Sequence, residues 1–132
     1  MTDHRPPALE RALQVSQDAV SIGFEWENIE QVWDKVHEEI GELKEVIASG
    51  QRDKQEEELG DLLFSVVNIG RWLGIDSEAA LHQMLQKFQR RFAQTQTLAL
   101  EDGRRLEDCS LEEMEEYWQT AKRFEREKKD IS

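Results

Sequence analysis

The sequence has few of the residues that break helices or cross-link chains. Its 132 residues include one cysteine, Cys109, two prolines and seven glycines. A single cysteine excludes an intrachain disulfide and agrees with a reducing compartment. No run of about 18 apolar residues occurs, and the opening residues MTDHRPPALE contain no apolar signal-peptide core. We therefore expect a cytoplasmic protein that does not span a membrane.

Basic residues are also scarce. The chain has 17 Lys and Arg against 29 Asp and Glu, which gives a formal net charge of −12. Such a surface repels nucleic acids and anionic membranes, so we expect neither as a partner. A polyanionic ligand would have to bind through metal ions. The length corresponds to one domain over residues 1–132, with a core at about 8–122.

The chain is rich in apolar residues spaced three and four apart, and strand-like alternation is absent. This pattern predicts an all-α helical bundle. The first helix is expected over Ala8–Ile22. Asn28 is a suitable N-cap for a second helix, and Gly50 can end it in the left-handed conformation. In this helix the candidate core residues are Ile29, Val32, Trp33, Val36, Ile40, Leu43 and Ile47.

Three further helices are predicted. Asp53 and Glu56 have the spacing of a capping box that opens the third helix. Its candidate core residues are Leu59, Leu62, Leu63, Val66, Ile69 and Leu73. Asp76 or Ser77 is expected to cap the fourth helix, with Leu81, Leu85, Phe88 and Phe92 as candidate core residues. Ser110 and the residue three positions later predict a capping box for the fifth helix, followed by a frayed tail, EREKKDIS.

Pairs of carboxylates lie beside the apolar stripes of the second and third helices. With Val36 as the zero of a 100° helical wheel, Glu39 falls near −60° and Glu42 near −120°. With Leu62 as zero, Glu58 lies near −40° and Asp61 near −100°. A short link makes the two helices antiparallel neighbours, so the pairs can face each other. Mutual repulsion would then require compensation, which a hard cation such as Mg²⁺ provides.

Other kinds of site find less support. The dipeptide His37-Glu38 begins like the zinc motif HExxH, but the fifth position is Gly41. Neither a nucleophile elbow nor a glycine-rich phosphate loop occurs. The simplest alternative is that the acids form only a solvated face, since Glu favours helices.

Four sequence blocks resemble successive parts of the MazG family of all-α nucleoside triphosphate pyrophosphohydrolases. They are KVHEEIGELKEVI, EEELGDLLFSVVNIGRWLGI, LQKFQRRF and MEEYWQTAK. The resemblance covers about Leu9 to Lys122 and is closest to the C-terminal catalytic domain of tandem relatives, although one copy is present here. It implies hydrolysis of a nucleoside triphosphate to the monophosphate and pyrophosphate, with Mg²⁺ or alternatively Mn²⁺.

The resemblance also implies roles for individual residues. The metal ligands carried over are Glu39, Glu42, Glu58 and Asp61, and Glu38 is a candidate general base. The expected nucleotide-binding residues are Lys87, Arg91, Trp118 and Lys122. Asn68 lies seven residues after Asp61, on the same helix edge, and could hydrogen-bond the base or sugar.

The spacing of these residues allows other interpretations. Lys87 and Arg91 share a helix face, where they could equally belong to a solvated surface or pair with acids. Trp118 could be a core or dimer-interface residue. Trp26, Trp33 and Trp72 are interpreted as packing residues.

Similar enzymes form dimers whose subunits complete each site, so we expect a homodimer, with a tetramer as the alternative. Two other functions remain open. One is a relative specific for dUTP, dCTP or phosphoribosyl-ATP, and the other is an acidic helical interaction module without activity.

Overall fold

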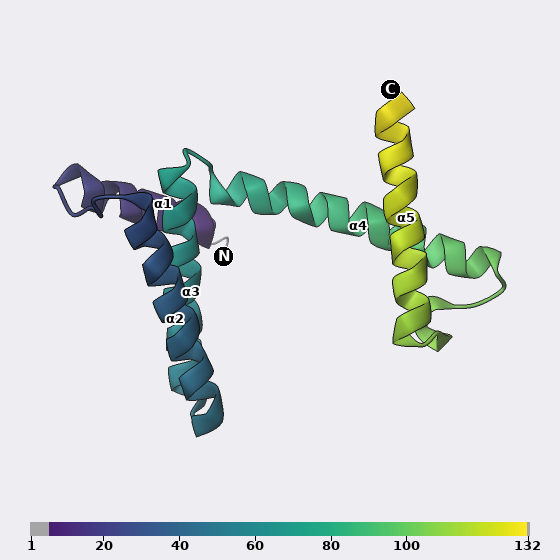
Figure 1. Ribbon diagram of the computed structural model, residues 1–132, viewed down its shortest axis with the longest axis horizontal. Coiled ribbons are helices and arrows are strands. Elements are labelled where there is room, and N and C mark those ends of the chain that lie inside the picture. The colour runs from purple at the N-terminus through teal and green to yellow at the C-terminus, as the bar shows by residue number, and fades with distance from the viewer. Residues whose placement is uncertain (1–5, 132) are drawn as a thin grey trace, which may run out of the picture. The chain divides into compact units, whose positions relative to one another are not determined.

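The chain folds entirely as helices. The computed structural model describes residues 6–131, with side chains to residue 129, and contains no β-strand in that range (Figure 1). The elements are α1 (Ala8–Ser21), α2 (Ile29–Ser49), α3 (Arg52–Trp72), α4 (Ser77–Glu101), the 3₁₀ turn η1 (Leu106–Asp108) and α5 (Leu111–Ile131). The predicted all-α class is confirmed. Within the described residues, no helix is both long and apolar enough to cross a membrane.

Several predicted helix ends are confirmed. The side chain of Asn28 accepts a hydrogen bond from the backbone N–H of Gln31 at 3.0 Å, as an N-cap does. Gly50 ends α2 with φ of 69°, in the left-handed region. Asp76 caps α4 by accepting hydrogen bonds from two backbone N–H groups at 2.9 and 3.3 Å. Ser110 and Glu113 form a reciprocal capping box at the start of α5.

One predicted helix end is wrong, and another helix runs further than its predicted core. Helix α3 begins at Arg52, and its N-cap residue Gln51 makes no side-chain cap, so Asp53 and Glu56 do not form the predicted box. The tail expected to fray continues α5 through Ile131. Its many Glu, Lys and Arg residues are good helix formers, and they explain why the helix extends so far.

The chain forms two compact units, Met1–Leu81 and His82–Ser132. In the first unit, α2 and α3 lie side by side and antiparallel, and α1 packs against α3 (Figure 1). The core of this unit contains Val32, Val36 and Ile69. Four partly buried residues pack against it, namely Trp26, Ile40, Leu62 and Trp72.

The buried faces of α2 and α3 match the prediction in part, because Val32, Val36, Ile40, Leu62 and Ile69 lie in the core or pack against it. Helix α3 buries Ser65, Val67, Asn68 and Ile69. Leu59, Leu63, Val66 and Leu73, which were expected in the core, are instead exposed. On α2, Trp33 and Ile47 are exposed as well, although both were predicted to pack. Acidic residues of the two helices face each other, and these four apolar residues of α3 are about half exposed.

In the second unit, α4 and α5 meet through aromatic rings and small buried side chains. Thr95, Ala99 and Ala121 are buried. The predicted core residues Phe88 and Phe92 are largely exposed, as are Leu81 and Leu85. The ring of Phe88 nevertheless stacks on Phe92 with centroids 5.9 Å apart and contacts Trp118 at 5.3 Å.

Candidate metal centre

Carboxylates from two helices meet on one side of the first unit. Glu39 of α2 and Glu58 and Asp61 of α3 each offer an oxygen, and these oxygens all lie within 4.8 Å of one another. Glu39 is only 4% exposed, Glu58 is half-buried and Asp61 is exposed. The side chains are therefore grouped as their spacing predicted, with one of them at the core.

Glu42 interacts with Glu39 and Glu58 of this group, although it is not one of the three residues whose oxygens lie within 4.8 Å of one another. A hydrogen bond with Glu39 is the largest cause that raises the pKa of Glu42 to about 7, followed by desolvation and the charges of Glu39 and Glu58. Two carboxylates can share one proton in this way because two adjacent negative charges repel. A cation among the four oxygens would remove the same repulsion.

Two carboxylate oxygens of the cluster lack partners. Oε2 of Glu39 and Oε2 of Glu58 are buried and have no hydrogen-bond partner among the described residues. A buried acceptor without a partner is costly, and proteins seldom leave one. The donor set consists only of carboxylate oxygens, which hard divalent cations such as Mg²⁺ prefer. These residues therefore fit a divalent cation.

Lys35 contacts the cluster, although it was not among the residues predicted from the sequence. Its Nζ lies 3.0 Å from Oε1 of Glu39 and 3.5 Å from Oε1 of Glu38. The hydrogen bond to Glu39 is the largest cause that raises the pKa of Lys35 above its usual value, against the opposing effect of burial. Its position four residues before Glu39, on the same helix face, was a signal that could have identified it. The ammonium group of Lys35 thus also pairs with the exposed side chain of Glu38, at the edge of the cluster.

Asn68 lies two helical turns after Asp61 and is 4% exposed. Its side-chain oxygen accepts a hydrogen bond from Ser16 of α1 at 2.5 Å. The side-chain carboxamide of Asn68, on α3, is thus hydrogen-bonded to α1 within the first unit.

The other predicted nucleotide-binding residues lie in the second unit. Arg91 donates hydrogen bonds from Nε and Nη2 to Oε2 of Glu125 at 3.3 and 2.9 Å. Its guanidinium also lies 5.2 Å from the ring centre of Trp118. Lys87 is exposed and Lys122 is half-buried. The structure thus joins Arg91 to Trp118 and adds Glu125, which the sequence analysis did not identify.

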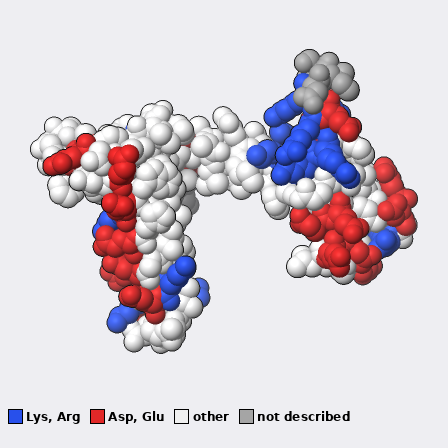
Figure 2. Space-filling view, in the orientation of Figure 1, with Lys and Arg blue, Asp and Glu red and all other residues white. Residues whose placement is uncertain are grey.

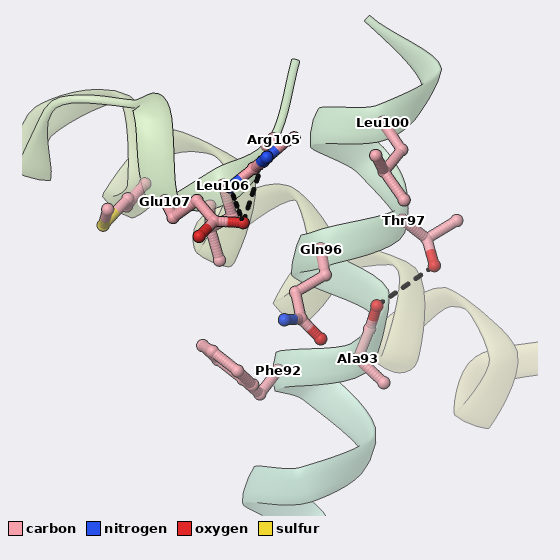
Figure 3. Close-up of a pocket in the computed structure, with 9 residues that line it drawn as sticks. Phe92, Ala93, Gln96, Thr97, Leu100, Arg105, Leu106 and Glu107 are labelled. Atoms are coloured by element: carbon pink, nitrogen blue, oxygen red, sulfur yellow. Dashed lines mark hydrogen bonds and ion pairs between the residues drawn. The ribbon is translucent and has the colours of Figure 1, made fainter. Parts of the chain in front are cut away.

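A separate pocket of about 670 Å³ opens in the second unit (Figure 3). Its lining residues include Phe92, Leu100, Arg105, Leu106 and Glu107. Arg105 and Glu107 form an ion pair at 2.7 Å on one side of it. None of the predicted site residues lines this pocket.

Charge is distributed unevenly over both units. Figure 2 shows acidic side chains along the α2–α3 pair. In the second unit, Lys and Arg gather over the C-terminal half of α5, and acidic residues gather over its N-terminal half (Figure 2).

These features define a class of protein. The chain is an all-α protein in which two antiparallel helices present an all-oxygen site suited to a hard divalent cation. The chain belongs to the MazG family: the model of the MazG nucleotide pyrophosphohydrolase domain matches residues 27–95, just over half of its length. The match includes all four carboxylates of the cluster. The family suggested by the sequence blocks is confirmed.

Curated relatives agree with this assignment. The chain is 44% identical over 116 residues to the nucleoside triphosphate pyrophosphohydrolase/pyrophosphatase MazG of Thermotoga maritima, covering 88% of this chain and 44% of that protein. It is 41% identical over 121 residues to the nucleoside triphosphate pyrophosphohydrolase of Escherichia coli K12, covering 90% and 46%. The chain thus spans less than half the length of these two relatives. An uncharacterized Bacillus subtilis protein, YabN, is 45% identical over 69 residues, covering 52% of this chain and 14% of that protein.

Proposed function

We propose that the protein hydrolyses nucleoside triphosphates to nucleoside monophosphates and pyrophosphate, with a divalent cation, Mg²⁺ or Mn²⁺, held by Glu39, Glu42, Glu58 and Asp61. The observation that carries the proposal is the carboxylate cluster with two buried oxygens that have no partner. The names of the T. maritima and E. coli relatives support the same activity.

A bound Mg²⁺ would neutralise triphosphate charge and activate water as a nucleophile. The four carboxylates would hold this ion. Carboxylates so close together are better stabilised by a shared cation than by water around each one. Glu38 would accept the proton of the attacking water, next to the Lys35 ammonium at 3.5 Å. The bond that breaks joins the α-phosphorus to the oxygen bridging to the β-phosphate, and pyrophosphate leaves with that oxygen.

The remaining residues would bind the nucleotide. Lys87, Arg91 and Lys122 would neutralise phosphate oxygens, as cations do in phosphoryl transfer. Trp118 would stack on the nucleoside, and the Arg91 guanidinium over its ring supports a fixed orientation of both. Asn68 would hydrogen-bond the base or sugar.

We propose a broad specificity for the base. The matches to general nucleoside triphosphate pyrophosphohydrolases support this reading over an enzyme restricted to dUTP, dCTP or phosphoribosyl-ATP. A panel of nucleotides separates the two, because a specialist turns over one member and a broad enzyme turns over several.

We also propose a homodimer. The stripe of Leu59, Leu63, Val66 and Leu73 on α3 supports it, because about half of the surface of these apolar side chains is exposed. Light scattering coupled to gel filtration should give twice the chain mass of 15.5 kDa at micromolar concentration. A single species of monomer mass would contradict the proposal, and four times that mass would indicate the tetramer.

The test of the activity is pyrophosphate release from mixed nucleotides with Mg²⁺ or Mn²⁺, and with EDTA. Glu39→Gln and Asp61→Asn should abolish release while circular dichroism shows unchanged helicity. Glu45→Gln is the matched control, because this exposed residue on α2 is outside the cluster. Turnover that survives in both cluster variants would refute the metal site, and no turnover by the wild type would favour an interaction module.

A further inference from the structure

Asn68 lies at the end of a chain of hydrogen bonds that crosses the first unit. Ser16 of α1 donates from Oγ to Oδ1 of Asn68 at 2.5 Å. Nε of Arg71, on α3, donates to the same Ser16 oxygen at 2.7 Å. The other two guanidinium nitrogens of Arg71 bind the two carboxylate oxygens of Glu25 at 2.5 and 2.8 Å. Nothing in the proposed reaction requires Ser16, Arg71 or Glu25 to touch the substrate.

The direction of the Ser16 proton follows from its two partners. Arginine has no acceptor, so Nε of Arg71 must donate, and the Ser16 oxygen accepts. The hydroxyl proton is then free for the second partner. The structure has Oγ of Ser16 donating this proton to Oδ1 of Asn68. The atom of Asn68 next to Ser16 is therefore the carbonyl oxygen.

This assignment fixes the orientation of the carboxamide. With Oδ1 facing Ser16, the two N–H donors of Asn68 point away from the Ser16 hydroxyl. Asn68 and Asp61 are seven residues apart on one helix edge, about 10 Å along the axis. A nucleoside attached to a phosphate at the carboxylates would extend over this distance.

The guanidinium itself is held firmly. The Arg71 side chain is 11% exposed and makes a bidentate pair with Glu25, the strongest geometry for such ions. Glu25 also accepts a hydrogen bond from the backbone N–H of Trp26 at 2.8 Å. Burial alone would raise the pKa of Glu25, but its bonds to Arg71 and Trp26 lower it below the usual value. The ion pair thus remains charged at neutral pH and does not release the guanidinium.

We propose that Ser16 and Arg71 are positioning residues that present Asn68 as a hydrogen-bond donor to an acceptor on the nucleoside part of the substrate. The acceptor is a carbonyl oxygen, ring nitrogen or sugar oxygen. This inference rests on the proposed function, and it adds a specific role to a residue that sequence spacing only suggested.

The test compares Ser16→Ala in two backgrounds. In the otherwise wild-type chain, loss of the hydroxyl frees the carboxamide to rotate, and KM for the nucleotide should rise about fivefold, the value of one neutral hydrogen bond. In an Asn68→Ala background the same change should have no further effect on KM. Ser65→Ala is the matched control, because this buried hydroxyl on α3 bonds only the carbonyl of Leu62.

Inorganic tripolyphosphate supplies a second readout as a competitive inhibitor without a nucleoside. Its inhibition constant should be the same for the wild type and for Ser16→Ala, because it touches only the cation and phosphate contacts. A purely structural role for Ser16 would weaken nucleotide and tripolyphosphate together, and would persist in the Asn68→Ala background. Either result would overturn the proposal.

A nuclear magnetic resonance measurement separates this inference from the proposed activity. In the full chain without nucleotide, Ser16→Ala should shift the side-chain ¹⁵N–¹H signals of Asn68, and Ser65→Ala should not. If the wild type hydrolyses no nucleotide, the proposed function fails and the nucleoside role fails with it. If turnover is normal but the Asn68 signals ignore Ser16→Ala, only the positioning role is refuted.

Discussion

Divalent cations should stabilise the fold, and the size of the effect follows from the unpartnered oxygens of the cluster. Each buried acceptor without a hydrogen bond costs about 1–3 kcal/mol. Oε2 of Glu39 and Oε2 of Glu58 are two such atoms. A cation that binds only the folded state adds about 2.7 kcal/mol of stability at 100 times its dissociation constant. This amount is within what two satisfied oxygens can supply.

The assay is thermal unfolding of metal-free protein as Mg²⁺ is titrated, followed by circular dichroism at constant ionic strength. For a chain of this length a gain of about 2.7 kcal/mol raises Tm on the order of 10 °C. Asp61→Asn should remove most of this increase, because it takes one oxygen ligand from the cluster. Asp61 is exposed, so the substitution leaves no new buried charge.

Two controls make the outcome decisive. Glu45→Gln removes an exposed charge from α2 outside the cluster and should keep the full increase. Sodium chloride at matched ionic strength should raise Tm far less, because screening acts weakly on closely spaced charges. The reasoning is wrong if Mg²⁺ does no more than sodium, or if Asp61→Asn responds as the wild type does.

Three further predictions concern packing and charge in the first unit. Val32→Ala, at a fully buried site, should lower the free energy of unfolding by about 2 kcal/mol in urea titrations, and an effect under 0.5 kcal/mol would contradict the described core. Gly41→Ala should raise it by about 0.5–1 kcal/mol, whereas Gly70→Ala should forfeit this gain, because its Cβ would lie 2.7 Å from a serine hydroxyl and 3.3 Å from a backbone carbonyl. Equal gains would refute the close approach. Because the pKa of Glu25 is lowered on folding, its stabilising effect is present above the unfolded value of about 4.5 and is lost as pH falls through the lower folded value. Glu25→Gln should therefore reduce the loss of stability on acidification, and parallel pH curves for the two proteins would show that the ion pair does not contribute.

The helices and their pairing could be predicted from local signals. Asn28, Gly50 and Ser110 mark helix ends through bonds within four residues, which the sequence displays directly. The short link at Gly50 places α2 beside α3. These local rules depend on the spacing of residues and on the residue types at turns, and both are visible in the sequence.

The faces that pack could not be predicted in the same way. Helical periodicity identifies the most apolar stripe, and on α3 this stripe contains Leu63 and Val66. The face turned toward α2 and α1 instead buries Ser65 and Asn68. A wheel weighted by hydrophobicity does not anticipate a polar buried face. Tertiary partners decide which side of a helix is covered.

Side-chain contacts between residues far apart in the chain could not be predicted from the sequence either. Ser16 meets residues 52 and 55 positions away, and Arg91 meets Glu125, 34 positions away. Any of the many acids and hydroxyls could have taken these places. Lys35 is different, since its two partners lie three and four residues later on the same helix and the local rule for ion pairs applies.

Whether the acids of α2 form a site or only a hydrated face is decided by burial and not by number. Glu45 is exposed, and its charge needs only water. Glu39 is 4% exposed, keeps a buried oxygen without a partner, and faces other carboxylates across to α3. Lys35 offsets one of these charges, that of Glu39. Placing several like charges at the edge of a core costs stability in the absence of a cation, and a residue chosen only for hydration gains nothing from this position. The position of Glu39 therefore supports the proposed cation site.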